Sequence, residues 1–74
     1  MKQDDPAHAI GQAIRARRTA AGVSQDQFAD RIGMHRAYYS AIERGEKNLT
    51  LLTLGRITAG LGCSLAALAI DADL

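Results

Sequence analysis

The sequence predicts an all-α domain of five short helices, and three observations lead to this prediction. Residues that favour helices, above all Ala, Leu and Arg, are abundant, and no stretch alternates β-branched and aromatic residues as a strand would. Apolar residues recur at helical spacing, and the segments that carry them are bounded by capping residues and glycines. A chain of 74 residues has room for one compact domain over residues 1–74.

The first helix is expected to start after Asp5, whose side chain can cap it. Pro6 then takes the first helical position, where its missing N–H costs nothing. Gly22 can adopt the left-handed conformation that ends a helix. A second helix should start at once, because Ser24 and Gln27 have the spacing of a capping box.

Residues 24–44 predict two helices joined by a tight turn. Phe28 and Ile32 share one face of the first helix, and Tyr39 and Ile42 share one face of the next. Gly33 between them can take the positive φ that such a turn requires. This is the pattern of a helix-turn-helix, whose second helix enters the major groove of DNA. We therefore expect a recognition helix at about residues 35–44.

The third helix has an unusual start, because its N-cap position falls on His35 rather than on Ser, Thr, Asp or Asn. The fourth helix follows Thr50, and the fifth follows Ser64, both of which are good caps. Gly55 and Gly60 weaken the fourth helix by up to about 1 kcal/mol each relative to alanine. The residues of the fourth helix expected to face inward are Leu51, Leu54, Ile57 and Leu61.

The charge is unevenly distributed along the chain. Acidic residues gather at the two ends, in tails at residues 1–5 and 71–74. Between Pro6 and Ile70 there are eight basic and four acidic residues, a net charge of +4, whereas the whole chain carries +1. A basic body is compatible with nucleic-acid binding, although a solvated charged surface is the alternative.

Several other classes of protein lack support in the sequence. Cys63 is the only cysteine, and His8 and His35 have no companion ligand at metal-binding spacing, so no disulfide, metal site or cofactor is expected. No nucleophile, base and orienting group can be assembled, so we do not expect an enzyme. The chain has no signal-sequence pattern, and its longest apolar stretch is shorter than the roughly 20 residues of a spanning helix. A cytoplasmic protein without membrane contact is expected.

These motifs resemble those of the phage-repressor and Cro-like, or XRE, family of helix-turn-helix proteins. The resemblance runs from Ile10 to about Leu68 and implies a lambda-repressor-like five-helix domain that binds double-stranded DNA. Residues 36–51, RAYYSAIERGEKNLTL, also look like the small dimeric controller proteins of restriction–modification systems. The motifs that carry the family resemblance are Ser24-Gln25, Phe28-Ala29, Ile32-Gly33, Ser40-x-Ile42-Glu43-Arg44-Gly45, Thr50-Leu51 and Leu61-Gly62-x-Ser64-Leu65.

Base contacts are expected from the side of the third helix that faces away from the core. Arg36 is the leading base reader, because a guanidinium group can pair bidentately with guanine, and a phosphate contact is its alternative. Tyr38 can reach a phosphate, a base edge or a methyl group, unless it is merely an exposed aromatic. The residues predicted to contact bases are Arg36, Ala37, Tyr38, Ser40 and Ala41.

Other positions take supporting roles. The residues predicted to contact phosphates are Gln25, Arg44, Lys47 and Asn48. The resemblance implies the role of Gln25, which starts the second helix, whereas the other three follow the third helix and are solvated in the alternative interpretation. The resemblance also implies a structural, partly buried ion pair between Arg18 and Glu43.

The fifth helix, within SLAALAI, has no charged face and therefore needs a cover. A second copy of the chain is the expected cover, and the alternative is that the helix packs into its own core. The predicted dimer interface comprises Leu52, Leu65, Ala66, Ala69 and Ile70. The resulting hypothesis is a homodimeric transcriptional regulator on a pseudo-palindromic operator. The alternatives are an antitoxin, which binds its promoter and caps a toxin, and a protein-interaction module that does not bind DNA.

Overall fold

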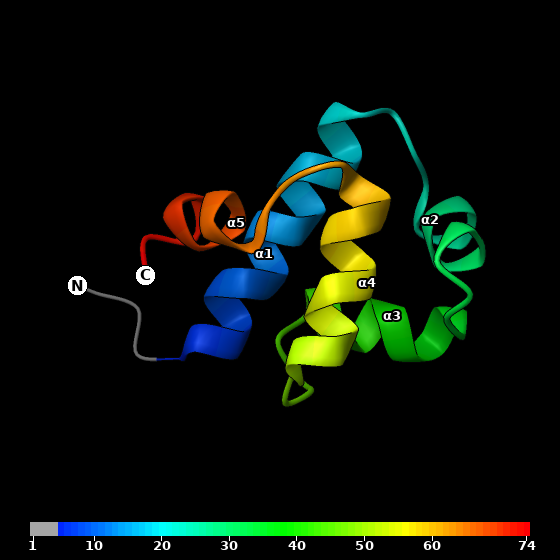
Figure 1. Cartoon of the computed structure of the whole chain (residues 1–74). Helices are drawn as coiled ribbons and strands as arrows, with labels where there is room; N and C mark the ends of the chain where they lie inside the picture. The colour runs from blue at the N-terminus through cyan, green and yellow to red at the C-terminus, as the bar shows by residue number, and fades with distance from the viewer. Residues whose placement is uncertain (1–4) are drawn as a thin grey trace.

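The computed structural model describes residues 5–74, which form five helices and no strand, as the sequence predicts. In Figure 1, α1 runs through the middle of the domain and contacts α3, α4 and α5, while α2 packs on α3. The helices are α1 (Pro6–Ala20), α2 (Gln25–Arg31), α3 (Arg36–Glu43), α4 (Leu51–Leu61) and α5 (Leu65–Asp71).

The helix starts are fixed locally by side-chain caps. Ser24 and Gln27 form the expected reciprocal capping box, with both hydrogen bonds at 3.0 Å. The N-cap of α3 is His35, which makes no side-chain capping bond, so this start is as weak as the sequence predicts. The other expected caps are also confirmed, and they are Asp5 for α1, Thr50 for α4 and Ser64 for α5.

One apolar core joins all five helices. Phe28 of α2 and Tyr39 of α3 are both fully buried, and their ring centroids lie 5.2 Å apart. This contact fixes how the two helices of the helix-turn-helix cross. The other core residues are Ala9, Ile10, Ala13, Ile14, Ala29, Ile42, Ile57, Leu68 and Ala72.

The expectation that Leu51 faces inward is wrong, because its side chain is 76% exposed. At 100° per residue, Leu51 lies at the edge of the arc that holds Leu54 and Ile57, and it belongs to the first turn of α4. The core therefore begins one turn later along this helix. Two neighbouring leucines, Leu51 and Leu52, are left on the surface.

The acidic C-terminal tail also starts later than expected. Asp71 is the last residue of α5, and its carboxylate forms an ion pair with the guanidinium of Arg17 on α1. Ala72 beyond it is buried in the core. This ion pair ties the end of α5 to the basic end of α1.

Gly60 and Gly55 of α4 are expected to respond in opposite directions to alanine. A Cβ at Gly60 would lie 2.5 Å from Ile32 Cγ2 and 3.1 Å from Phe28 Cζ, whereas a Cβ at Gly55 meets nothing within 4 Å. Gly60→Ala should therefore lower the free energy of unfolding by about 1–3 kcal/mol. Gly55→Ala should raise it by about 0.5–1 kcal/mol, because alanine favours the helix. Urea denaturation measures both, and equal shifts in one direction would contradict the close packing of α4 on α2.

Within residues 5–74, no single helix is long and apolar enough to cross a membrane. Taken together, α4 and α5 reach that length and composition, but they are bent by 89° at the break between them.

Candidate nucleic-acid interface

The turn between α2 and α3 is closed by backbone hydrogen bonds and by one distant side chain. Gly33 has a φ of +66°, and the N–H of Met34 donates to the carbonyl of Ala29 at 2.8 Å. Arg56 on α4 donates from Nη2 to the carbonyls of Ile32 and Gly33, at 2.6 and 2.8 Å. These bonds satisfy carbonyl groups that the end of α2 leaves free, so Arg56 braces the turn.

The role of Arg56 is not predicted by the sequence. A weak signal was present, since a helix that ends at a glycine turn leaves carbonyl groups without donors, and Arg56 had no assigned role. The two segments are separated by more than 20 residues, and only the fold brings them together.

The first turn of α3 presents exposed side chains to solvent. Arg36, Ala37 and Tyr38 are exposed, as predicted for base contacts, and Ser40 is half-buried. Lys47 from the loop after α3 places its ammonium 5.5 Å from the centroid of the Tyr38 ring. A cation over the ring limits where Tyr38 can point.

The expectation that Ala41 is exposed is wrong, because only 6% of it is accessible. On the helical wheel Ala41 lies away from the core residue Tyr39, so the core does not cover it. A helical wheel drawn for α3 alone does not show which other segments lie beside Ala41. The N–H of Glu46 donates to the carbonyl of Ala41 at 2.9 Å, and Lys47 reaches Tyr38 one turn before it.

The predicted phosphate-contacting residues differ in how they are held. Gln25 is half-buried, and its amide donates to Glu43 Oε1 at 2.8 Å, which orients the side chain at the start of α2. Arg44 is exposed and donates to Ser40 Oγ at 2.7 Å and to both carboxylate oxygens of Glu46. Lys47 and Asn48 are exposed in the loop.

Arg18 and Glu43 form the ion pair that the family resemblance implied. Arg18 Nε donates to Glu43 Oε2 at 2.6 Å and Nη2 donates to Oε1 at 3.0 Å, while both residues are at least nine-tenths buried. The third donor, Nη1, reaches the carbonyl of Val23 at 2.7 Å. The hydroxyl of Tyr39 donates to Glu43 as well. One carboxylate thus joins α1, α2 and α3 beneath the exposed side of α3.

These contacts shift the acidity of the groups involved. Burial alone would raise the pKa of the Glu43 carboxyl, but hydrogen bonds from Arg18, Tyr39 and Gln25 outweigh it and hold that pKa below its usual range. The hydrogen bond to Glu43 raises the pKa of Arg18, and burial raises the pKa of Tyr39. Glu43 is therefore ionised and fully hydrogen-bonded in the folded protein at neutral pH.

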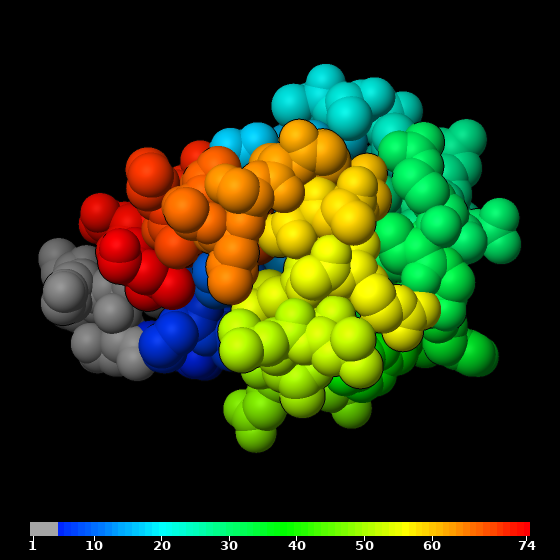
Figure 2. All heavy atoms as spheres, in the orientation of Figure 1, coloured from blue at the N-terminus to red at the C-terminus, as the bar shows by residue number. Residues whose placement is uncertain are grey.

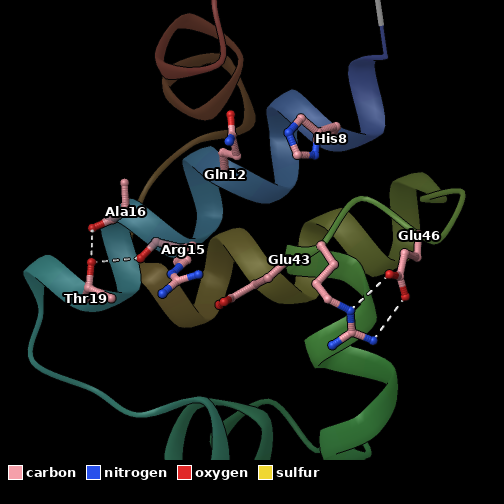
Figure 3. A pocket seen from close by; sticks show the side chains of 8 residues that line it. His8, Gln12, Arg15, Ala16, Thr19, Glu43 and Glu46 are labelled. Atoms are coloured by element: carbon pink, nitrogen blue, oxygen red, sulfur yellow. Dashed lines mark hydrogen bonds and ion pairs between the residues drawn. The ribbon is translucent and has the colours of Figure 1, made fainter.

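An open hollow of about 660 Å³ lies between α1 and the end of α3 (Figure 3). His8, Gln12 and Arg15 of α1 line one side, and Glu43 and Glu46 line the other. Arg44 also lines it and donates to Glu46. Arg15 therefore lies near the end of α3, across the hollow from the residues that follow this helix.

Arg36 is paired with an acid that the sequence analysis did not single out. Its Nε and Oδ1 of Asp26, in the first turn of α2, are in ion-pair contact, and both side chains are largely exposed. Helical spacing alone cannot place α2 beside the start of α3, because the turn geometry decides which residues face each other. The predicted base reader therefore has a carboxylate neighbour on the exposed face.

Comparison with known proteins gives consistent results. A family model described as helix-turn-helix matches residues 14–68. The control protein C.MunI from Mycoplasma sp is 41% identical over 59 residues, which are 80% of each chain.

Solved structures are similar over most of their length. The clp gene regulator ClgR from Corynebacterium glutamicum matches with a TM-score of 0.89 and 31% identity, over 92% of this chain and 87% of that one. The restriction-modification controller protein C.Esp1396I, solved as a tetramer with its natural 35 base-pair operator, matches with a TM-score of 0.83 and 26% identity. That match covers 97% of this chain and 100% of the other.

Proposed function

The chain belongs to the helix-turn-helix family of DNA-binding transcriptional regulators, and from this premise we propose that it acts as a homodimer on a pseudo-palindromic operator. The family consists of regulators and not of enzymes. The observation that carries the proposal is the exposed first turn of α3, with Arg36 and Tyr38, held on a buried ionic and aromatic scaffold. Such a turn is the part of a recognition helix that meets base edges.

Arg36 is assigned to a base edge in this proposal, and Ala37, Tyr38 and Ser40 complete the reading surface. Ala41 is no longer included, because it is buried. Gln25 starts α2, and Arg44, Lys47 and Asn48 follow α3, and all four are assigned to the DNA backbone that runs beside an inserted helix. Their contacts position the protein and make binding depend on salt, because each neutralised phosphate releases counterions.

The apolar face formed by α4 and α5 supports the dimer. Leu52 and Ile70 are each 76% exposed, and Leu65 is 41% exposed. Figure 2 shows α4 and α5 side by side on one face of the molecule. A groove of about 500 Å³ lies where α5 meets the start of α1 and the loop before α4, and its apolar lining includes Ile10, Leu49, Leu54, Leu65 and Ala69. Ala66 and Ala69 are short enough to allow a second α5 to approach closely.

A two-fold dimer through this face would place two α3 helices about 34 Å apart, in successive major grooves. The structure of C.Esp1396I, a tetramer on its operator, is that of an oligomer on DNA. C.MunI is likewise named a control protein. We infer from these relatives that the chain serves a restriction–modification system as its controller.

Selection of bound sites from random duplexes tests the proposed function directly. We expect pairs of inverted half-sites whose centres lie about one helical turn apart, together with a dimer mass in solution. Binding should weaken steeply as salt is raised. A chain that binds no duplex DNA at low salt would overturn the proposal. A monomer that co-purifies with a small toxic protein would instead favour an antitoxin.

Replacing Arg36 with alanine is expected to relax base preference at one position of each half-site. A bidentate contact to guanine is worth about 1–3 kcal/mol of discrimination, so the preference there should fall by roughly five- to 150-fold. Asn48→Ala is the matched control, because a lost phosphate contact at this exposed loop residue weakens binding to all sequences equally. Competition binding with single-base variants of the selected site measures both. Equal losses for Arg36→Ala on every sequence would reassign Arg36 to a phosphate.

A further inference from the structure

The ion pair between Asp26 and Arg36 lies on the face that the proposed function assigns to DNA. Asp26 is in the first turn of α2 and Arg36 is in the first turn of α3, so the pair bridges the two helices of the helix-turn-helix. The two side chains are 71% and 64% exposed. An ion pair this exposed contributes little to the stability of the fold. Stability therefore does not explain why the two charged side chains lie together on this face.

The contact leaves part of the guanidinium group unused. The closest approach to Asp26 is made by Nε of Arg36. Among residues 5–74, no hydrogen bond engages Nη1 or Nη2 of Arg36. Nη1 and Nη2 are the two terminal donors that can point together at O6 and N7 of one guanine.

We propose that Asp26 is a positioning residue for base recognition, because its carboxylate holds Arg36 by Nε and directs Nη1 and Nη2 towards a guanine. The inference rests on the proposed function and names a specificity determinant within it. An arginine side chain has many rotamers, and fixing it before binding reduces the entropy lost when the base contact forms. The carboxylate also repels phosphates, so it disfavours registers in which no guanine meets Arg36.

The opposite role, in which Asp26 merely competes with DNA for Arg36, leads to a different result. Removing a competitor strengthens binding to the operator and preserves the preference for guanine. Removing a positioning carboxylate reduces that preference, while binding to unrelated DNA rises because a negative charge has gone. The ratio of operator to non-specific affinity therefore separates the two roles.

The experiment compares Asp26→Asn with Asp30→Asn, alone and in combination with Arg36→Ala. Asp30 is an exposed acid on the same helix and forms no ion pair among the described residues, so its replacement changes the charge without touching the pair. Affinities are measured for the selected operator, for variants with each base at the position read by Arg36, and for a random duplex. Circular dichroism and thermal unfolding check that each variant is folded.

For Asp26→Asn we expect the preference for guanine at that position to fall by about two- to five-fold, the range of a surface ion pair. Asp30→Asn should leave the preference unchanged, and Asp26→Asn should have no further effect on it once Arg36 is alanine. An unchanged or increased preference in Asp26→Asn would overturn the inference, as would an equal fall in the Arg36→Ala background. If Arg36→Ala itself leaves base preference intact, the assignment of Arg36 to a base fails first, independently of Asp26.

Discussion

Replacing Glu43 with alanine is expected to lower the free energy of unfolding by about 3–5 kcal/mol, the cost of leaving one partner of a buried ion pair alone. Small domains have a total stability of about 5–15 kcal/mol, so much of the protein should be unfolded under mild heating. The change deletes the carboxylate that accepts hydrogen bonds from Arg18, Tyr39 and Gln25. Arg18 would keep its bond to the carbonyl of Val23 but would otherwise be a buried, unpaired cation.

Urea and thermal denaturation measure this effect, and Glu46→Ala is the matched control. Glu46 also pairs with an arginine, but both partners of that pair are more than half exposed, so its loss should have little effect on stability. Replacing both members of the buried pair, as in Arg18→Met with Glu43→Leu, should recover much of the lost stability. Similar losses in Glu43→Ala and Glu46→Ala would show that the buried pair does not hold α1 to α3.

Stability should also depend on pH through Glu43. Its pKa in the folded protein lies below the ordinary value of 4.5, so its stabilising contribution is complete above that value. The contribution is lost as pH falls through the lower folded-state pKa, when the carboxylate must accept a proton. Glu43→Gln cannot lose this contribution on acidification, so its unfolding free energy should vary less with pH in the acid range than that of the unchanged protein.

The elements that the sequence predicted well are those determined by neighbours along the chain. Caps such as Ser24 and Ser64 act within three residues, and periodic apolar residues such as Phe28 and Tyr39 mark one helix face. The buried pair of Arg18 and Glu43 came from the family resemblance and was confirmed by geometry. Nothing in the spacing of 25 residues would have indicated it.

The elements that the sequence could not predict depend on how distant segments meet. Ala41 is buried although the helical wheel of α3 alone places it away from the core residue Tyr39. Arg56 braces a turn on another helix, and Asp26 meets Arg36 only because the Gly33 turn sets α2 beside α3. Helix faces are local properties, whereas contacts between helices depend on crossing angles, and these emerge from packing the whole core.

Replacing Ile70 with glutamate is expected to dissociate the proposed homodimer. The side chain is 76% exposed in the single chain, so the substitution should leave the monomer fold intact. Burying an isoleucine against a partner contributes about 1.5–3 kcal/mol, and a two-fold interface contains it twice. The dimer should therefore weaken by about a hundredfold or more, and two carboxylates would also be brought together at the interface.

Sedimentation or light scattering across a range of concentrations measures the fraction of dimer. Binding to a duplex that contains one half-site measures DNA contact without the contribution of dimerisation. Ile70→Glu should reduce binding to the complete operator strongly and leave binding to the half-site unchanged. Ala20→Glu is the control, because it adds the same charge at an exposed position at the end of α1. Leu52→Glu should behave like Ile70→Glu, since Leu52 is equally exposed on the same predicted interface.

The comparison of Leu52 with Ile70 is the stricter part of this test, because the two residues lie on different helices. If both α4 and α5 contribute to one two-fold interface, each variant alone should give a monomer that still folds and still binds a half-site. A dimer that survives Ile70→Glu but not Leu52→Glu would move the interface to the start of α4, where Leu51 is also exposed. If the dimer persists in both Ile70→Glu and Leu52→Glu, the apolar face is not the dimer interface. It would then be available to a different protein partner, which is the arrangement expected of an antitoxin.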